Sequence, residues 1–385
     1  MACCAHRSTL PDSTLTDQLA ALDPALRREL EAHGFRDEQL LRWAGERAGD
    51  PSRNWVKGRV EVPAPGDVQP LPARDSAEGR ELAERGMAAL AAGELAVIVL
   101  AGGMATRMGG VVKALVEALP GLTFLDARLA ERAHWERKAG APLPLWLMSS
   151  TATDEPLRVA LGAAGPAVRI FGQFASLRLT PDGLLFLDAH GRPSVYAPGH
   201  GDLPDALAQS GLLAGFVARG GRTVWIANLD NLGASIDPLV LGWHLARSAQ
   251  LTVEVVEQYP GDKGGLPVRL DGRLEILENF RVPPGFDQDA VGVFNTNTFL
   301  VDAPSLAGLE MDWTYFRVEK TVEGRPAVQF ERLIGELTST LETRFLLVPR
   351  EGDDSRFVPV KEPGDLARNA PQIERLMAPI LGTAS

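Results

Sequence analysis

The stretch Leu95-Ala-Val-Ile-Val-Leu-Ala-Gly-Gly-Met-Ala-Thr-Arg-Met-Gly-Gly-Val-Val-Lys113 decides the fold class. Its first six residues are all apolar, which is typical of a strand buried on both faces of a sheet. The glycines that follow let backbone N–H groups approach a phosphate, and Arg107 and Lys113 add positive charge for a polyphosphate. The spacing fits neither a Walker loop nor a Gly-x-Gly-x-x-Gly dinucleotide fingerprint. The alternative is an ordinary tight turn with surface charges.

Further strand-like runs follow this stretch, and amphipathic segments separate them. Helices are expected over residues 123–139 and 203–220, and Thr123 and Asp126 have the spacing of a capping box. Such strand–helix alternation predicts an α/β fold with a doubly wound, mostly parallel mixed sheet and helices on both faces. The further strands are expected at residues 144–148, 222–228, 251–258 and 291–301.

Three zones are predicted along the 385 residues. Residues 1–92 form a helical N-terminal region with a linker at 58–74, where proline excludes a helix or a central strand. Residues 93–343 form the α/β domain. Residues 344–385 form a short C-terminal segment.

Composition excludes several classes of protein. The chain has 39 basic and 50 acidic side chains, a net charge of −11, which argues against a nucleic-acid partner. Its only cysteines, Cys3 and Cys4, are adjacent, so a disulfide framework is not expected. The N-terminus lacks the apolar core of a signal peptide, and no apolar run reaches about 20 residues. We therefore expect a cytoplasmic protein with no membrane partner.

Other segments place polar groups beside strands or helices. In Asn228-Leu-Asp-Asn-Leu-Gly233, Asp230 follows a strand and could hold Mg²⁺ together with substrate phosphates. The alternative for Asp230 is a helix cap or a turn. His200 lies between two glycines before a helix, so backbone amides and an imidazole share one loop. The alternative for this segment is a surface turn. Phe294-Asn-Thr-Asn-Thr298 places two amide side chains in an apolar strand. Because buried amides need partners, this pattern is typical of an edge strand or of a ligand-binding surface.

Taken in order, nine motifs resemble those of the eukaryotic-type UTP–glucose-1-phosphate uridylyltransferase (UDP-glucose pyrophosphorylase) family. The match spans roughly residues 95–365, and the order of the motifs is more specific than any one of them. The motifs are the glycine-rich loop with its lysine, Thr123-Phe-Leu-Asp126, Leu147-Met-Ser-Ser150, Pro198-Gly-His-Gly-Asp202, Asn228-Leu-Asp-Asn-Leu-Gly233, Lys263-Gly-Gly265, Glu278-Asn-Phe-Arg-Val-Pro283, Phe294-Asn-Thr-Asn297 and Arg356-Phe-Val-Pro-Val-Lys361.

The resemblance implies a Rossmann-like nucleotide-diphospho-sugar transferase fold and a reaction. UTP and glucose 1-phosphate would give UDP-glucose and pyrophosphate by in-line attack on the α-phosphorus, with Mg²⁺ as cofactor. Residues 93–343 would be the nucleotidyltransferase domain, and the C-terminal segment would carry the catalytic lysine. Because that segment is too short for the β-helical domain of eukaryotic members, a monomer or small homo-oligomer is expected.

The resemblance also implies roles for individual residues. Lys361, Lys113 and Arg107 would be catalytic through their charge, and Asp230 would hold Mg²⁺. The substrate-binding positions would be Ala101, Gly102, Gly103, Gln173, Gly199 and Asn228 for the nucleotide, His200 and Lys263 for phosphate groups, and Glu278 and Asn297 for the sugar hydroxyls. Three of these residues are among the only six lysines of a chain that is otherwise rich in arginine.

Two alternatives remain open at this point. One is a pyrophosphorylase for another UDP-sugar or a UDP-N-acetylhexosamine, which differs only in the sugar pocket. The other is a non-catalytic nucleotide-sugar sensor. It is favoured only by Ala105 and Val112, which stand where the family usually has glycine and proline.

Overall fold

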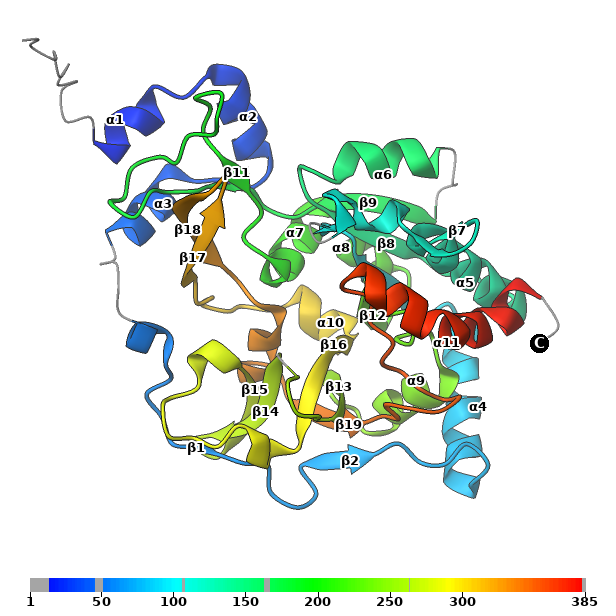
Figure 1. Ribbon diagram of the computed structural model, residues 1–385. Helices are drawn as coiled ribbons and strands as arrows, with labels where there is room; N and C mark the ends of the chain where they lie inside the picture. Colours follow the sequence, from blue (N-terminus) through cyan, green and yellow to red (C-terminus); the bar gives the residue numbers. More distant parts are fainter. Residues whose placement is uncertain (1–13, 46–50, 106–107, 163–166, 263, 383–385) are drawn as a thin grey trace, which may run out of the picture. The chain divides into compact units, whose positions relative to one another are not determined.

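The computed structural model describes residues 14–45, 51–105, 108–162, 167–262 and 264–382, which belong to two compact units (Figure 1). The smaller unit combines the N-terminal residues up to 53 with residues 174–198 and 315–331, and the larger unit contains the remainder. The chain therefore re-enters the smaller unit twice. The boundaries predicted at 92/93 and 343/344 do not coincide with the ends of these units.

An eight-stranded sheet forms the centre of the larger unit, in the order β2-β19-β13-β16-β12-β3-β8-β9. Strand β16 runs antiparallel to both its neighbours, β12 and β13, and the other pairs of adjacent strands are parallel. This arrangement confirms the mostly parallel mixed sheet. The strands are β2 (Val68–Pro70), β3 (Leu95–Leu100), β8 (Leu145–Ser149), β9 (Val168–Gly172), β12 (Thr223–Asn228), β13 (Leu251–Glu257), β16 (Val293–Asp302) and β19 (Thr343–Leu347).

Helices cover both faces of the sheet. Leu145 and Leu147 of β8 belong to a core cluster that includes side chains of α4, α5, α9 and α11, whereas Trp146 meets Phe216 of α8 edge to face, 5.6 Å between ring centroids. Alternate residues of one strand thus pack on opposite layers. The helices of this unit are α4 (Ala77–Ala91), α5 (Phe124–Ala139), α6 (Asp154–Leu161), α7 (Leu203–Ser210), α8 (Leu212–Ala218), α9 (Pro238–Ala246), α10 (Ala303–Ala307) and α11 (Pro363–Leu381).

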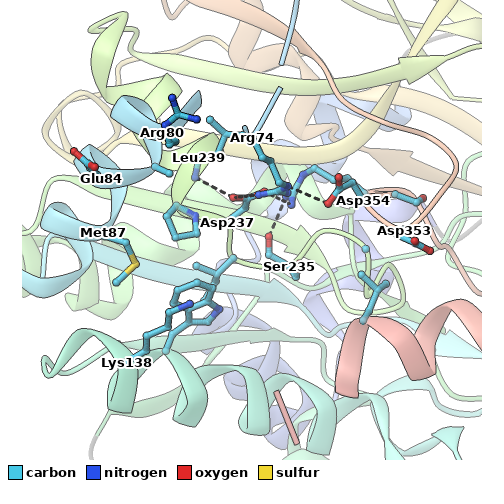
Figure 2. Close-up of a pocket in the computed structure, with 18 residues that line it drawn as sticks. Arg74, Arg80, Glu84, Met87, Lys138, Ser235, Asp237, Leu239, Asp353 and Asp354 are labelled. Atoms are coloured by element: carbon cyan, nitrogen blue, oxygen red, sulfur yellow. Dashed lines mark hydrogen bonds and ion pairs between the residues drawn. The ribbon is translucent and has the colours of Figure 1, made fainter. Parts of the chain in front are cut away.

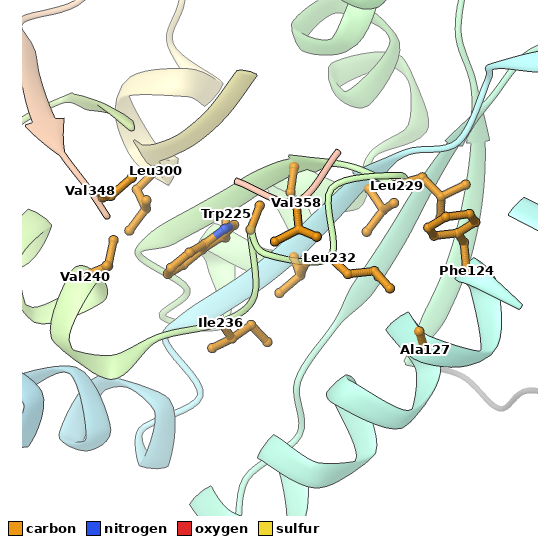
Figure 3. Packing of buried hydrophobic residues seen from close by; sticks show 14 of the residues in the cluster. Phe124, Ala127, Trp225, Leu229, Leu232, Ile236, Val240, Leu300, Val348 and Val358 are labelled. Atoms are coloured by element: carbon orange, nitrogen blue, oxygen red, sulfur yellow. The ribbon is translucent and has the colours of Figure 1, made fainter. Parts of the chain in front are cut away.

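The core extends beneath the loop that follows β12. Leu229, Leu232 and Ile236 of this loop are buried beside Trp225 of β12 and Val358 (Figure 3). Burial of apolar side chains at regular intervals fixes the path of the loop, although it has no regular secondary structure.

Helices α4 and α9 cross closely, and two glycines make the crossing possible. A Cβ atom on Gly86 would lie 1.9 Å from the Pro238 carbonyl oxygen, and one on Gly242 would lie 1.7 Å from the Leu82 carbonyl oxygen. Larger residues would separate the helices. The crossing holds the start of α9, and therefore the end of the loop after β12, against α4.

The helix expectations are confirmed with one difference. Thr123 caps α5, because its hydroxyl accepts the Asp126 N–H (3.1 Å) while the Asp126 carboxylate accepts the Thr123 N–H (3.0 Å). The helix expected over 203–220 is instead two helices, α7 and α8. Gly211 separates them with a left-handed φ of 71°.

Short strands complete the larger unit, and no helix in the described ranges is long and apolar enough to cross a membrane. As expected for a proline-rich linker, β1 and β2 lie only at sheet edges. The additional strands are β1 (Val60–Glu61), β4 (Met104–Ala105), β5 (Val111–Val112), β6 (Glu117–Leu119), β7 (Leu122–Thr123), β14 (Gly265–Leu270) and β15 (Arg273–Glu278).

The smaller unit has its own core, in which Trp43 packs against Phe330, 5.2 Å between ring centroids. Three helices supply the N-terminal part of this core, and this confirms the helical character predicted there. The elements are α1 (Leu15–Ala20), α2 (Pro24–Ala32), α3 (Asp37–Ala44), β10 (Ser176–Leu177), β11 (Val195–Tyr196), β17 (Phe316–Val322) and β18 (Arg325–Glu331).

Candidate active site

The glycine-rich loop folds back on itself after β3. The Ala101 N–H donates to the Met148 carbonyl (2.9 Å), which ties the start of the loop to β8. Strands β4 and β5 then pair antiparallel, and the Lys113 N–H points to the Gly103 carbonyl (3.3 Å). The loop therefore returns Lys113 to the glycines. Arg107 lies outside the described residues.

Gln173 lies against the same loop. Its N–H donates to the Ser149 carbonyl (2.8 Å), and its side chain is buried. A Cβ atom on Gly102 would lie 2.5 Å from Gln173 Oε1, so only glycine leaves room for the amide at this distance. Ser150 Oγ donates to the Gly102 carbonyl (2.9 Å). The structure thus places a buried carboxamide beside the glycine-rich backbone.

Asp230 meets Lys113 at the carboxyl edge of the sheet. Strands β3 and β12 are adjacent and parallel, so the segments that follow them emerge side by side. Lys113 Nζ forms an ion pair with Asp230 Oδ2, and their side chains are 17% and 15% exposed. Each charge neutralises the other. A triphosphate can replace Asp230 as the partner of Lys113, and a divalent cation can replace Lys113 as the partner of Asp230.

A buried arginine fixes the backbone that carries Asp230. Arg128 of α5 donates to the carbonyls of Asn228 (3.1 Å) and Asn231 (2.7 Å), on either side of Asp230. Glu131 balances its charge (2.9 Å) and accepts the Ile236 N–H (2.6 Å). One helix therefore holds both ends of the loop after β12.

Two asparagines from adjacent strands meet beside this loop. Asn297 Nδ2 donates to Asn228 Oδ1 (2.8 Å). Asn297 lies at a bulge of β16 and has a left-handed φ of 61°, and the Asn295 side chain accepts its N–H (2.8 Å). Bulges redirect side chains and are frequent at functional sites. Here the bulge directs the Asn297 amide to the Asn228 side chain.

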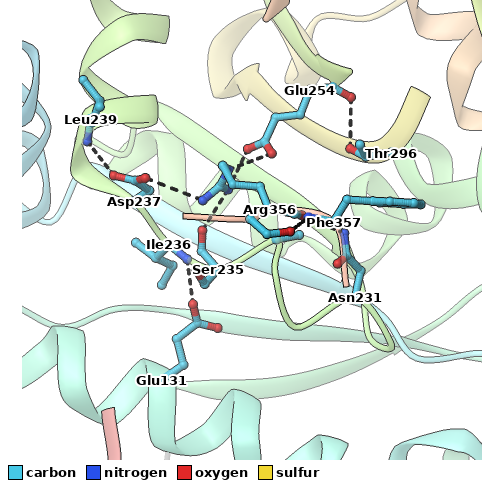
Figure 4. Close-up of polar contacts among 12 residues, drawn as sticks. Glu131, Asn231, Ser235, Ile236, Asp237, Leu239, Glu254, Thr296, Arg356 and Phe357 are labelled. Atoms are coloured by element: carbon cyan, nitrogen blue, oxygen red, sulfur yellow. Dashed lines mark hydrogen bonds and ion pairs between the residues drawn. The ribbon is translucent and has the colours of Figure 1, made fainter. Parts of the chain in front are cut away.

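The segment that ends in Lys361 is bound to the loop after β12 (Figure 4). Asn231 clamps it, donating from Nδ2 to the Arg356 carbonyl (3.2 Å) and accepting the Val358 N–H at Oδ1 (2.8 Å). The Val360 N–H then donates to the Asp230 carbonyl (3.0 Å). Lys361 follows directly, so hydrogen bonds place it next to the Asp230 backbone.

The side chain of Arg356 anchors this segment in the core. It donates two hydrogen bonds to Glu254 of β13 (2.9 and 2.7 Å) and one to the Ser235 carbonyl (3.0 Å). Asp237 lies 3.6 Å from the same guanidinium and also binds Arg74. Burial tends to raise the pKa of the Asp237 carboxyl, but the Arg74 hydrogen bond and the Arg356 charge lower it overall. Asp237 is therefore an anion at neutral pH.

The Lys361 side chain is exposed, and within the described ranges it forms no ion pair. Its N–H donates to Asp365 Oδ2 (2.7 Å) at the start of α11. Burial tends to raise the pKa of Asp262, yet a hydrogen bond from Arg350 lowers it, and the Lys361 charge contributes to the lowering. Lys361 thus presents its ammonium group to solvent, where a phosphate can reach it.

Gly199 and His200 lie against a different backbone segment. Gly199 has φ 122°, and a Cβ there would lie 2.6 Å from the Arg332 carbonyl oxygen, so the position requires glycine. His200 Nδ1 accepts the Ile334 N–H (3.0 Å). The neutral imidazole therefore carries its proton on Nε2, which is oriented as a hydrogen-bond donor.

Glu278 ends β15, and the 3₁₀-helix η7 (Ile334–Ser339) connects it with His200. Thr338 Oγ1 accepts the Ile276 N–H of β15 (2.8 Å), while η7 begins at the residue that binds His200. A Cβ on Gly265 would lie 3.0 Å from Glu278 Oε1, so glycine leaves room for the carboxylate. Lys263 lies outside the described residues. The predicted site residues are thus held in two groups, one around Asp230 and one around η7.

The chain is similar to known proteins along most of its length. The family model described as UTP–glucose-1-phosphate uridylyltransferase matches residues 59–373. The chain belongs to this family. A protein of that name from Astragalus penduliflorus is 32% identical over 295 residues, which cover 71% of this chain and 61% of that protein. Our chain therefore spans about three fifths of that relative's length.

Solved structures show the same family fold. A mutant UDP-glucose pyrophosphorylase from Leishmania major, in complex with UDP-glucose, aligns at TM-score 0.65 and 25% identity, over 91% of this chain and 76% of that one. A uridine diphosphate N-acetylglucosamine pyrophosphorylase from Trypanosoma brucei, in complex with an inhibitor, aligns at TM-score 0.71 and 20% identity, over 93% and 82%. The nucleotide-sugar transferase fold expected from the motifs is confirmed.

Sequence reasoning missed the residues that position this family's motifs here. Arg128 and Glu131 follow Phe124 at helical intervals, so a charged pair on the apolar stripe of α5 was the available signal. Glu254 also stands in an apolar strand, where a carboxylate requires a partner. Nothing near Glu254 in the sequence identifies that partner as Arg356, 102 residues away.

Proposed function

We propose that this protein transfers the uridylyl group of UTP to glucose 1-phosphate, forming UDP-glucose and pyrophosphate. The Lys113–Asp230 pair beside the glycine-rich backbone and Gln173 is the observation that supports this function most directly. At one edge of the sheet it combines the Gln173 amide for a nucleobase, the Lys113 ammonium group for phosphates and the Asp230 carboxylate. The names of the family's members supply the choice of UTP and glucose 1-phosphate.

When UTP binds, Lys113 exchanges its ion-pair partner. Lys113 leaves Asp230 for the triphosphate, so a charge pair in the protein is replaced by a charge pair with the substrate. The Gln173 carboxamide hydrogen-bonds the uracil edge, and the Gly102 and Gly103 backbone lies along the nucleotide. Asn228, held by Asn297, reaches the ribose.

The chemical step is an in-line displacement. A phosphate oxygen of the sugar 1-phosphate forms a bond to the α-phosphorus, and the bond from that phosphorus to the oxygen bridging the β-phosphate breaks. Pyrophosphate leaves with the bonding electrons. Lys361 stabilises the charge on the α-phosphate oxygens, and Lys113 stabilises the departing phosphates. Since no proton must be removed from an ionised phosphate, a general base is not required.

The donor set suits Mg²⁺ as the cofactor. Asp230 offers one carboxylate, and groups of three or more metal-binding side chains do not occur in the described parts of the chain. Mg²⁺ is commonly held by one or two carboxylates together with substrate phosphates, and the single aspartate fits that pattern. When bound, the ion neutralises phosphate charge. Lys113 is the residue that must move to free Asp230.

The sugar side is formed by Glu278, Asn297 and His200. The Glu278 carboxylate accepts hydrogen bonds from hydroxyls, the Asn297 amide can both accept and donate them, and His200 donates a hydrogen bond from Nε2–H to the sugar phosphate. A monomer or small homo-oligomer in the cytoplasm remains a prediction from the sequence.

Release of pyrophosphate tests the proposal. Purified protein is incubated with UTP, Mg²⁺ and glucose, galactose or N-acetylglucosamine 1-phosphate, and pyrophosphate is measured by a coupled assay. We expect the highest kcat/KM with glucose 1-phosphate, and loss of release in Asp230→Ala. Higher activity with another sugar would reassign the substrate. No release with any sugar would favour the non-catalytic sensor.

A further inference from the structure

A cavity of about 700 Å³ lies between α4, the end of α5 and α11 (Figure 2). Four cationic and four anionic side chains line it, so its charge favours neither an anionic nor a cationic ligand. Among the described residues, none of those assigned above to a substrate or to Mg²⁺ lines it. A cluster of buried charges beside residues 199–202, by contrast, contacts the loop that carries His200.

The loop of residues 199–202 lies against the backbone of residues 332–334. The Gly201 N–H donates to the Arg332 carbonyl (3.1 Å), and the same carbonyl oxygen would lie 2.6 Å from a Cβ atom on Gly199. The Ile334 N–H donates to His200 Nδ1 (3.0 Å). One short backbone segment therefore holds three consecutive residues of the loop.

The bond to His200 uses the start of a helix. Ile334 is the first residue of η7, and the first N–H groups of a helix have no partner inside that helix. His200 Nδ1 supplies the partner, so the neutral imidazole carries its proton on Nε2. The donor assigned to the sugar phosphate thus depends on one hydrogen bond to the backbone two residues after Arg332.

The side chain of Arg332 holds the end of the same loop. Its guanidinium forms ion pairs with Asp202 Oδ1 (3.2 Å) and Asp205 Oδ2 (2.6 Å), and it lies over the Trp313 ring, 4.3 Å from the centroid. Arg332 is 1% exposed and Asp202 is fully buried, and all four residues belong to the larger unit. Because a buried carboxylate requires a cation beside it, the charge of Arg332 keeps Asp202 inside the fold.

We propose that Arg332 is a positioning residue for the sugar phosphate, which keeps His200 in the tautomer that donates from Nε2. Asp202 lies two residues after His200, and Asp205 is in the first turn of α7, so the guanidinium joins the end of the loop to this helix. Without the guanidinium, Asp202 moves towards water and draws His200 away from the Ile334 N–H. The role rests on the proposed function for the identity of the ligand, whereas the tautomer is a property of the protein alone.

The tautomer is tested by nuclear magnetic resonance of the 15N-labelled full chain without substrate. The chain has six histidines, so the imidazole signal that disappears in His200→Gln identifies His200. We expect only the Nε2–H tautomer in the unmodified protein and both tautomers in Arg332→Gln. Arg332→Lys keeps a cation beside Asp202 but lacks the fork that binds two carboxylates, so it should fold and show a smaller share of the second tautomer. Only the Nε2–H tautomer in every folded Arg332 variant would overturn the proposal.

Turnover gives a second readout. In Arg332→Gln and, to a lesser degree, in Arg332→Lys, KM for glucose 1-phosphate should rise, by about tenfold in the former, since a hydrogen bond to a charged group is weakened, while kcat stays within about twofold. The control Arg269→Gln removes an arginine that binds Asp67 (2.7 Å) outside the candidate site, and it should change neither KM nor the His200 tautomer. An equal rise of KM in the control, or a fall in kcat with unchanged KM, would contradict a positioning role. If no sugar 1-phosphate supports turnover, the tautomer comparison still decides whether Arg332 orients His200, so failures of the two proposals are distinguishable.

Discussion

Replacing Arg356 by methionine is expected to lower the free energy of unfolding by about 3–5 kcal/mol, the usual cost of removing one partner from a buried ion pair. Arg356 is 3% exposed and Glu254 is fully buried, and two hydrogen bonds of 2.9 and 2.7 Å join them. Methionine approximates the length of the arginine stem but leaves the Glu254 carboxylate without its cation. Urea unfolding followed by far-UV circular dichroism measures the loss.

The loss should depend on pH in a direction that identifies Glu254. Burial raises the pKa of Glu254 above its ordinary value of 4.5, and the Arg356 charge opposes the rise. Without Arg356 the folded-state pKa rises further, so the folded variant retains a proton that the unfolded chain releases. Its stability is greatest below the unfolded pKa and falls as pH rises towards the folded pKa. The difference from the unmodified protein should therefore be smallest near about pH 5 and increase towards about pH 8.

Two variants control the experiment. Arg344→Met removes an exposed arginine whose partner Glu342 is also exposed, and it should cost less than about 1 kcal/mol. Arg356→Met/Glu254→Leu removes both buried charges and should recover most of the stability lost in the single variant. A single variant that loses less than about 1 kcal/mol, or whose loss does not change with pH, would refute a stabilising Arg356–Glu254 pair.

Three further outcomes are expected for the proposed reaction. Lys361→Ala should lower kcat by about 10²–10³ while UTP affinity by calorimetry changes little, since its ammonium acts on transition-state charge; a collapse of UTP affinity would contradict that role. Asp230→Asn should raise the Mg²⁺ concentration needed for half-maximal activity by at least about tenfold, and an unchanged Mg²⁺ titration would place the metal elsewhere. Gly102→Ala should raise KM for UTP, because its methyl group displaces the Gln173 amide 2.5 Å away; Gly308→Ala, whose methyl group would meet only the Pro304 carbonyl oxygen at 3.6 Å, lies outside the site and serves as the control.

Local patterns were sufficient to predict most of the elements. The apolar run of β3 and the capping box of Thr123 and Asp126 act over a few residues, so spacing alone identifies them. The break at Gly211 was missed because one glycine inside an apolar pattern is compatible with a continuous helix or with two.

Patterns in the chain are enough to identify the motifs, their order and the mostly parallel sheet on which they depend. The tertiary structure alone decided which motifs meet. Insertion of β16 between β12 and β13 brings Asn297 to Asn228, and the parallel pairing of β3 with β12 brings Lys113 to Asp230 across 117 residues. Helix and strand signals are local, because they depend on residues a few positions apart. An ion pair between distant residues depends on the order of the strands in the sheet. The residues next to Lys113 or Arg356 in the chain therefore do not identify the carboxylate with which each one pairs.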